Sequence, residues 1–242
     1  MSLNSALWQI PAVNLSEDHL AGLQRKLEER LGEISSRFKD VRFATSLAAE
    51  DMAVTHGIAN NKKSIRVFTL ATGRLHAETV EMTNLVESTY GLSIERVEPD
   101  QTDVEAYISQ YGLNGFYDSE EAKKKCCQIR KVKPLELALK GADAWITGQR
   151  RSQSVTRLDL PFEELDESRG IPKFNPIFDW SDEDLWAYLV WQKVPLHPLH
   201  QKGFPSIGCE PCTRAIRANE DLRAGRWWWL SQQSKECGLH VK

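Results

Sequence analysis

The feature that most constrains the fold is the alternation of short apolar runs with segments of helical length between residues 17 and 147. Runs rich in β-branched and aromatic residues predict strands over 41–47, 65–70, 92–97 and 142–147. Segments with helical spacing or helix-start signals predict helices over 17–37, 48–60, 76–90 and 103–111. Strands that alternate with helices form a mostly parallel sheet covered on both faces, so we expect an α/β fold.

The first predicted helix has a clear start and one apolar face. Ser16 precedes Glu17 and Asp18, and this order is typical of a helix N-cap followed by an acidic first turn. Apolar residues then recur at helical spacing, at Leu20, Leu23, Leu27, Leu31 and Ile34. We expect this stripe to face the core.

The strand–helix alternation stops after residue 157. Residues 158–176 are rich in acids, proline and glycine, which predicts a long excursion that can form a hairpin. Ser181 and the acids after it predict the start of a helix that runs to about residue 191. Three prolines, Pro195, Pro198 and Pro205, then exclude a regular helix up to Cys209.

Three of the segments that follow predicted strands are candidates for binding a ligand. Segments 45–51, 71–74 and 148–157 carry small, hydroxyl or basic residues. Ligands on parallel sheets bind beyond the carboxyl ends of the strands, and a strand–turn–helix start presents free N–H groups to a phosphate. Neither a Walker loop nor a G-x-G-x-x-G motif is present. A single turn of this kind is as typical of an ordinary βα connection as of a nucleotide site. The convergence of three such segments favours a nucleotide site.

Four cysteines form two pairs in the sequence, and basic residues lie on both sides of the first pair. Cys126 and Cys127 are adjacent, at the expected start of a Lys-rich helix, and Cys209 and Cys212 form C-E-P-C. Four thiolates can hold Zn²⁺ or an iron–sulfur cluster, although an adjacent pair is less typical of zinc. Nearby cations, Lys123, Lys124, Lys125, Arg130 and Lys131, can offset the thiolate charge or bind an anion. For Lys123 and Lys124 we expect a solvated helix face.

A fifth cysteine lies six residues from the end of the printed sequence. Cys237 is followed by Gly238 and flanked by Lys235 and His240, and a nearby cation favours the thiolate. The pattern fits a mobile nucleophile carried by a tail, and equally an incidental thiol near a terminus.

Size and composition restrict the class of protein. The 242 residues and 41% hydrophobic content suit one large α/β domain. We expect 1–220 to form it, with an N-terminal arm and helix over 1–40 and a C-terminal segment over 221–242.

The net charge of −3 gives no general attraction to nucleic acid. No apolar run reaches the roughly 20 residues of a membrane span, and no secretory leader is visible, so we expect a cytoplasmic protein without membrane or nucleic-acid partners. The oligomeric state, including a homo-oligomer, is left open.

Taken together, the motifs resemble those of the assimilatory sulfonucleotide reductases, in the branch that reduces adenosine 5′-phosphosulfate. The motifs are C-C-Q-I-R-K, T-G-Q-R-R-S-Q-S-x-T-R, K-F-N-P-I, S-I-G-C-E-P-C-T-R, G-R-W-W-W and K-E-C-G-L-H. The segments S-L-A-A-E-D and V-F-T-L-A-T-G-R-L-H extend the resemblance, which covers residues from about 40 to 240.

The resemblance implies a fold, a cofactor and a reaction. It implies a fold like that of the adenine nucleotide α-hydrolases, related to the PP-loop pyrophosphatases. It implies a 4Fe–4S cluster on Cys126, Cys127, Cys209 and Cys212. Cys237 would attack the sulfate sulfur of adenosine 5′-phosphosulfate, release AMP and become an S-sulfocysteine. Thioredoxin, or a similar dithiol protein, would then release sulfite, within sulfate assimilation and cysteine biosynthesis.

The resemblance also implies a set of binding residues. The candidates for the phosphosulfate are Arg130, Lys131, Arg157, Arg223 and Arg226, with His240 nearby. Leu70, Gly73 and Gly148 would lie along the nucleotide. At the first turn the family often has Ser-Gly-Ala where Leu47, Ala48 and Ala49 stand, and often Asp at Ala71, so the contacts expected there come from Thr45, Ser46 and Glu50.

Three other functions predict different features. Reduction of 3′-phosphoadenosine 5′-phosphosulfate uses the same chemistry, but such family members generally lack the four cluster cysteines that this chain has. A PP-loop enzyme that thiolates tRNA predicts S-G-G-x-D-S after the first strand and a broad basic surface, and neither is seen. A Cys₄ zinc module that binds nucleic acid predicts stoichiometric zinc and salt-dependent binding.

Overall fold

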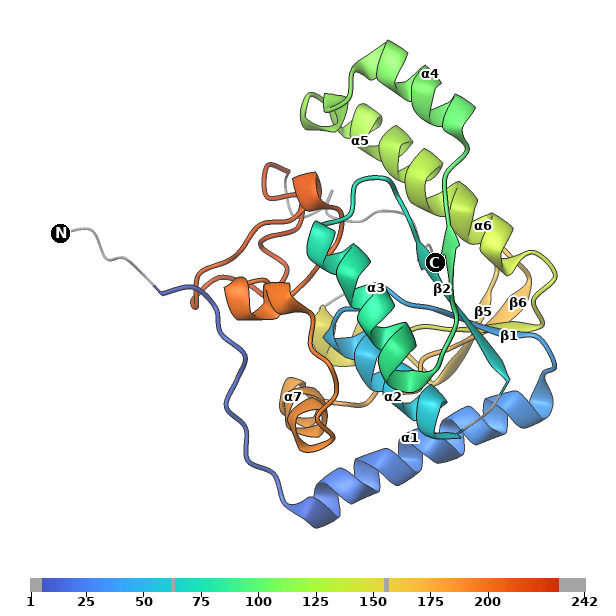
Figure 1. Cartoon of the computed structure of the whole chain (residues 1–242), viewed down its shortest axis with the longest axis vertical. Coiled ribbons are helices and arrows are strands. Elements are labelled where there is room, and N and C mark those ends of the chain that lie inside the picture. The colour runs from blue at the N-terminus through green and yellow to red at the C-terminus, as the bar shows by residue number, and fades with distance from the viewer. Residues whose placement is uncertain (1–5, 62–63, 155–156, 231–242) are drawn as a thin grey trace.

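The computed structural model describes residues 6–61, 64–154 and 157–230. Within these ranges six strands form one sheet in the order β3-β2-β1-β4-β6-β5 (Figure 1). The strands are β1 (Val41–Ala44), β2 (Ile65–Leu70), β3 (Ile94–Val97), β4 (Ala144–Ile146), β5 (Glu163–Asp166) and β6 (Ile171–Phe174). Neighbouring strands are parallel, except that β5 and β6 form an antiparallel hairpin. The expected mostly parallel α/β fold is confirmed.

Helices cover both faces of the sheet (Figure 1). The α-helices of the described ranges are α1 (Glu17–Arg37), α2 (Ala49–Asn61), α3 (Ala77–Tyr90), α4 (Gln101–Tyr111), α5 (Glu120–Cys127), α6 (Lys133–Leu139) and α7 (Asp182–Trp191). Successive strand side chains point to opposite faces. In β2, Val67 joins the core formed with α1, α2 and α7, whereas Phe68 packs with Leu135 and Leu139 of α6. The sheet therefore separates two cores.

Most of the predicted elements are present. Helix α1 has the predicted bounds, its apolar stripe is buried, and Ser16 caps it by accepting a hydrogen bond from the His19 amide at 3.3 Å. The excursion after residue 157 forms the β5–β6 hairpin, and Ser181 caps α7 by accepting from the Asp184 amide at 2.9 Å. Strand β1 is shorter than predicted, ending at Ala44, because the next residues turn toward the site.

The position of the adjacent cysteines within their helix was predicted wrongly. Cys126 and Cys127 close helix α5 rather than open it. The helix begins earlier because Ser119 accepts a hydrogen bond from the Ala122 amide at 3.1 Å and acids follow in the first turn. A π-helical turn, Gln128–Val132, then connects α5 to α6 and turns its basic residues inward.

The expectation of a solvated face at Lys123 is also wrong. The Lys123 side chain is buried, with 1% of the residue exposed, whereas Lys124 is exposed and pairs with Glu120 at 2.8 Å. The two lysines differ because one face of α5 packs toward Cys209, Cys212 and Trp227, and successive helical residues point about 100° apart.

The N-terminal arm crosses the molecule to the segment that precedes the C-terminus. The Trp8 amide donates to the Ile216 carbonyl at 2.9 Å, and the Trp8 ring packs on Trp186 of α7 with centroids 5.6 Å apart. Between residues 195 and 209 the prolines allow a short 3₁₀ turn, Pro198–Lys202. Among the described helices, none has the length and apolar character that a bilayer crossing requires.

Candidate active site

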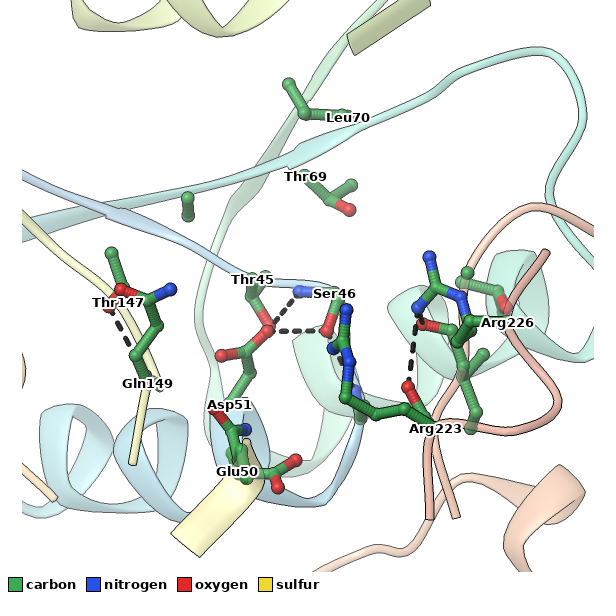
Figure 2. A pocket seen from close by; sticks show the side chains of 18 of the residues that line it. Thr45, Ser46, Glu50, Asp51, Thr69, Leu70, Thr147, Gln149, Arg223 and Arg226 are labelled. Atoms are coloured by element: carbon green, nitrogen blue, oxygen red, sulfur yellow. Dashed lines mark hydrogen bonds between the residues drawn. The ribbon is translucent and has the colours of Figure 1, made fainter. Parts of the chain in front are cut away.

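A cavity opens at the carboxyl ends of the central strands, where the chain changes direction. Strand β1 pairs with β2 on one side and with β4 on the other, so the connections after β1 and β4 leave the sheet edge in different directions. Such a switch point leaves a crevice for a ligand. The cavity wall combines three groups of residues: the turns after β1, β2 and β4, Lys131 of the π-helical turn, and the stretches 205–209 and 222–227 (Figure 2).

The turn after β1 is closed by Asp51. The Ser46 amide and hydroxyl both donate to Asp51 Oδ2 at 2.6 Å, as Figure 2 shows. Burial raises the pKa of Asp51 to about 6, although the bonds from Ser46 oppose the shift. Leu47 is buried with φ at +60°, a conformation that costs a branched residue roughly 1–2 kcal/mol. Its amide donates to Thr45 Oγ1 at 3.1 Å, which keeps the turn closed despite the missing glycine.

Gly148 brings the end of β4 against this turn. A Cβ atom at Gly148 would lie 2.2 Å from Asp51 Oδ1 and 3.1 Å from the Asp51 amide nitrogen. Only glycine allows this approach, so β4 and the start of α2 can enclose the cavity together.

An ion-pair cluster lies behind the same turn. Arg150 Nη2 is 2.9 Å from Glu50 Oε1 and 2.8 Å from Asp182 Oδ1 at the start of α7. The guanidinium is almost completely buried, with 3% of its side chain exposed. Burial alone would raise the pKa of Glu50, but Arg150 holds it below its usual value. Glu50, expected to contact substrate, therefore also joins two helix starts.

Basic side chains form the opposite part of the wall. Lys131, Arg157, Arg223 and Arg226 all line the cavity. Arg226 donates to the Ile207 carbonyl at 2.9 Å, and a Cβ at Gly208 would come within 2.4 Å of Arg226 Nη2. Figure 2 shows Arg223 and Arg226 on the opposite side of the cavity from Thr147 and Gln149. The arrangement offers several positive charges to one anion.

The structure brings most of the predicted binding residues together. Those on the cavity wall are Thr45, Ser46, Glu50, Leu70, Gly148, Lys131, Arg157, Arg223 and Arg226. Arg130 and Gly73 are not among the lining residues; Arg130 Nη1 instead donates to the Thr72 carbonyl at 2.7 Å. Gly73 has φ at +70°, and an added Cβ would lie 3.1 Å from Arg130 Nη1. Cys237 and His240 lie outside the described residues.

Sequence reasoning named segments 45–51 and 148–157 as ligand candidates, but it did not single out several of the residues that line the wall, among them Asp51, Gln149 and Arg150. Gln149 is buried, and in the described part of the chain its Oε1 atom has no hydrogen-bond partner. An acceptor of this kind on a cavity wall is available to a ligand. The position of Gln149 and Arg150 directly after a buried strand was the available signal.

The four cysteines of the two pairs meet beside this cavity. Cys127, Cys209 and Cys212 form a buried cluster with Phe116 and Trp227, and Cys126 packs against it. We call these six residues the cysteine cluster. Within the described ranges none of these four cysteines forms a disulfide, and Thr72 Oγ1 lies 3.3 Å from Cys209 Sγ. Among the described residues, no three His, Cys, Asp or Glu side chains form a group arranged to hold a metal ion.

Burial and neighbouring charges shift the pKa values of two thiols in the cysteine cluster in opposite directions. Burial raises the pKa of Cys212 to about 12, and charge on Cys209 and Cys126 adds to the shift. Burial acts the same way on Cys209, but Lys131, Thr72 and Arg226 lower its pKa below the usual value. Cys209 also lines the cavity, so it is common to both sites.

The fold and this site define an α/β nucleotide-binding protein in which a group of buried thiols adjoins the ligand cavity. The model of the phosphoadenosine phosphosulfate reductase domain matches residues 40–215, and the chain belongs to that family. The chain is 53% identical over 237 residues to the adenosine 5′-phosphosulfate reductase of Neisseria meningitidis serogroup A, covering 97% of each. It is 55% identical over 222 residues to the enzyme of the same name from Burkholderia cepacia, covering 92% of this chain and 89% of that one.

A solved structure shares the fold. The phosphoadenylyl-sulfate reductase of Candida auris, in a phosphate complex, superposes with a TM-score of 0.68 at 24% identity. The match covers 84% of this chain and all of the other. The fold expected from the resemblance is thereby confirmed.

Proposed function

We propose that this chain reduces adenosine 5′-phosphosulfate to sulfite and AMP in the cytoplasm, with reduced thioredoxin or a similar dithiol protein as electron donor. The observation that carries the proposal is one cavity in which the ligand-binding edge of the sheet meets Lys131, Arg223 and Arg226. The names of the relatives support the same substrate and a place in sulfate assimilation and cysteine biosynthesis.

The two ends of the cavity suit the two ends of this substrate. The ends of β1, β2 and β4 offer backbone groups, the Ser46 hydroxyl and the Gln149 acceptor to an adenosine. The basic wall suits the phosphosulfate, because guanidinium groups match tetrahedral oxyanions and stabilise the charge that builds up on departing AMP.

The reaction itself is assigned to Cys237, at a position outside the described residues. Its thiolate attacks the sulfate sulfur, the bond from that sulfur to the bridging phosphate oxygen breaks, and AMP leaves with the electron pair. One thiol of the dithiol protein then attacks Cys237 Sγ and expels sulfite, and its second thiol restores the Cys237 thiol. The dithiol loses two electrons, which the sulfur that leaves as sulfite gains.

A 4Fe–4S cluster is the cofactor that we propose for Cys126, Cys127, Cys209 and Cys212. The donor set fits in its chemistry: Cys127, Cys209 and Cys212 are buried in one cluster with Cys126 packed against it, and thiolates are the ligands that hold iron–sulfur clusters. The indole Nε1 of Trp227 is also buried without a hydrogen-bond partner among the described residues, and cluster sulfur would offer it an acceptor. When bound, the cluster would supply a fixed charge and a structural support beside the cavity.

Turnover on two nucleotides tests the substrate. With reduced thioredoxin, we expect sulfite release from adenosine 5′-phosphosulfate to exceed that from the 3′-phosphorylated nucleotide. Equal or faster turnover of the 3′-phosphorylated form would assign the chain to the alternative substrate of the same family. Metal analysis and an absorption spectrum test the cofactor, because stoichiometric zinc contradicts it.

The site of the covalent intermediate is tested without any dithiol. Incubation with ³⁵S-labelled adenosine 5′-phosphosulfate should leave the label on the peptide that contains Cys237. A Cys237→Ser variant should keep its iron but release no sulfite. Label on another peptide, or turnover by the serine variant, contradicts the assignment of the nucleophile.

A further inference from the structure

Trp227, like Cys209, belongs both to the cavity wall and to the cysteine cluster. Its side chain lines the cavity, yet it packs among the cysteines with 1% of the residue exposed. Its amide donates to the Cys212 carbonyl at 3.1 Å. Its φ is +42°, a left-handed conformation in which an aromatic residue is strained, so surrounding contacts must hold it. The indole therefore forms a wall between the two sites.

Cations gather on this indole from different elements. The Lys123 ammonium of α5 lies 4.5 Å from the centroid of the Trp227 ring. The Arg226 guanidinium carbon lies 4.6 Å from the same centroid, and Lys131 Nζ lies 6.0 Å away. All three distances are within the range of a cation–π interaction. Arg226 and Lys131 also line the cavity, whereas Lys123 does not.

Lys123 is the member of this group that the reaction does not explain. It is one of the largest fully buried side chains of the described chain, with 1% of the residue exposed. An ammonium ion loses much hydration on burial, and a π face compensates for only part of that loss. The ammonium lies beside the cysteine cluster, because it packs on Trp227 and α5 carries both Lys123 and the adjacent cysteine pair. A nearby cation favours the thiolate over the thiol.

We propose that Lys123 is a positioning residue: it holds the Trp227 indole as the wall between cavity and cysteine cluster, and its charge stabilises the anionic group on the cysteines. The inference rests on the proposed 4Fe–4S cofactor. It distinguishes Lys123 from its neighbour Lys124, which points to solvent and pairs with Glu120. Lys123 does not touch the substrate cavity, so its effect reaches the reaction through Trp227 and the thiolates.

The test compares Lys123→Met with Lys124→Met in purified, cluster-loaded protein. Methionine keeps the length of the side chain and suits a buried site, so we expect both variants to fold, which circular dichroism checks. Loss of the absorption near 400 nm under an iron chelator should be about ten-fold faster in Lys123→Met, as for other outer-shell changes at metal sites. Lys124→Met should match the wild type. Lys123→Arg, which keeps the charge, should lie closer to the wild type than Lys123→Met.

A redox titration provides a second readout that a purely structural role would not move. A nearby positive charge stabilises the reduced, more negative form of a cluster. The midpoint potential should therefore fall in Lys123→Met and stay unchanged in Lys124→Met. Should Lys123→Met fail to fold, Trp227→Phe carries the test, because loss of the indole face must by itself speed chelation.

Failure of this inference and failure of the proposed cofactor give different results. Wild-type protein without iron contradicts the cofactor. Wild-type protein with a full cluster, together with equal chelation rates and potentials in the two methionine variants, contradicts the role of Lys123 alone. An unchanged chelation rate in Trp227→Phe contradicts it in the same way.

Discussion

Asp51 places a carboxylate at the turn where we expect the adenosine end of the ligand to bind. It accepts two hydrogen bonds from Ser46 at 2.6 Å and faces Gly148 closely enough to exclude any side chain there. Ser46 can therefore keep one orientation on the cavity wall. The Asp51 carboxylate fixes the turn through its bonds from Ser46. Protonation can lessen its negative charge in the cavity that also contains the expected anion site.

The pH dependence of stability should reveal the ionisation of Asp51. Its pKa of about 6 lies above the ordinary value of 3.8, so the folded protein binds the proton more tightly than the unfolded chain. This contribution is present below pH 3.8 and is lost as pH rises through about 6. Asp51→Asn should therefore gain stability relative to wild type between pH 5 and pH 8, by about 1 kcal/mol or roughly 2–4 °C in Tm. Thermal melts at both pH values measure it; a constant difference contradicts the assignment.

Gly148→Ala should disturb the nucleotide end of the cavity. The added methyl group would meet Asp51 Oδ1 at 2.2 Å and the Asp51 amide at 3.1 Å, so β4 and α2 must separate. Small displacements of binding groups reduce affinity strongly, and we expect AMP to bind at least about ten-fold more weakly. Isothermal titration with AMP measures this. Gly32→Ala is the control, because nothing lies within 4 Å of its Cβ position; unchanged AMP affinity in Gly148→Ala contradicts the geometry.

Among the elements, the starts of α2 and α7 are joined by a single buried guanidinium. Arg150 follows β4 and reaches Glu50 at the start of α2 and Asp182 at the start of α7. It also donates to the Trp180 carbonyl at 3.2 Å. The strand end that forms the cavity is thereby tied to the helices beside it, which limits how far the cavity can open.

Arg150→Met should destabilise the protein substantially. The substitution leaves Glu50 with little water and without its cation, and breaking a buried ion pair from one side costs about 3–5 kcal/mol. Urea unfolding of wild type and variant measures the change. Arg37→Met is the control: Arg37 pairs with Glu163 at 2.7 Å but is 39% exposed, so its loss should reduce stability far less than the loss of Arg150. Equal losses in the two variants contradict the role of Arg150.

Local sequence patterns predicted the helices and strands better than they predicted which segments pack against one another. The stripe of α1 and the run Ile65–Leu70 of β2 are visible because periodicity is a local property. The inward position of Lys123 and the approach of Gly148 to Asp51 were not visible, because they depend on which segments pack together. The candidate binding residues were predicted through the family resemblance, which gives positions but not contacts. Arg130 illustrates this, because it bonds to the Thr72 carbonyl and is not among the residues that line the cavity.

At the scale of the whole molecule, the N-terminal arm packs over a set of buried histidines. Trp8 of the arm lies 6.4 Å from the ring of His200, which also packs edge-on against Trp186. His197 packs edge-on against His200 with ring centroids 6.2 Å apart, and its Nε2 lies 2.9 Å from Thr79 Oγ1. His76 packs against Phe204. Burial lowers the pKa of each of these histidines, that of His197 to about 4.

The protein should therefore lose stability when the pH falls below neutrality. His197 Nδ1 accepts from the Leu199 amide at 3.2 Å, so the proton of the neutral ring lies on Nε2 and points to Thr79. A histidine with a depressed folded pKa stabilises the fold above its unfolded pKa of 6.5, and this contribution is lost as pH falls toward 4. For one such group the loss approaches about 1.4 kcal/mol per pH unit. Between pH 6 and pH 4 the protonation of Asp51 instead stabilises the folded protein as the pH falls. We expect the loss of stability from protonating three buried histidines to be larger than this gain.

The variant His197→Asn separates this effect from other acid sensitivities. Asparagine Oδ1 can replace Nδ1 as acceptor for the Leu199 amide, but it cannot take up a proton in this range. We expect the variant to be less stable than wild type at pH 8, because it leaves space and loses the Thr79 contact. Between pH 7 and pH 5 it should lose less stability than wild type does, because one buried group no longer charges. Urea unfolding at three pH values measures both slopes, and parallel slopes would show that His197 does not couple folding to pH.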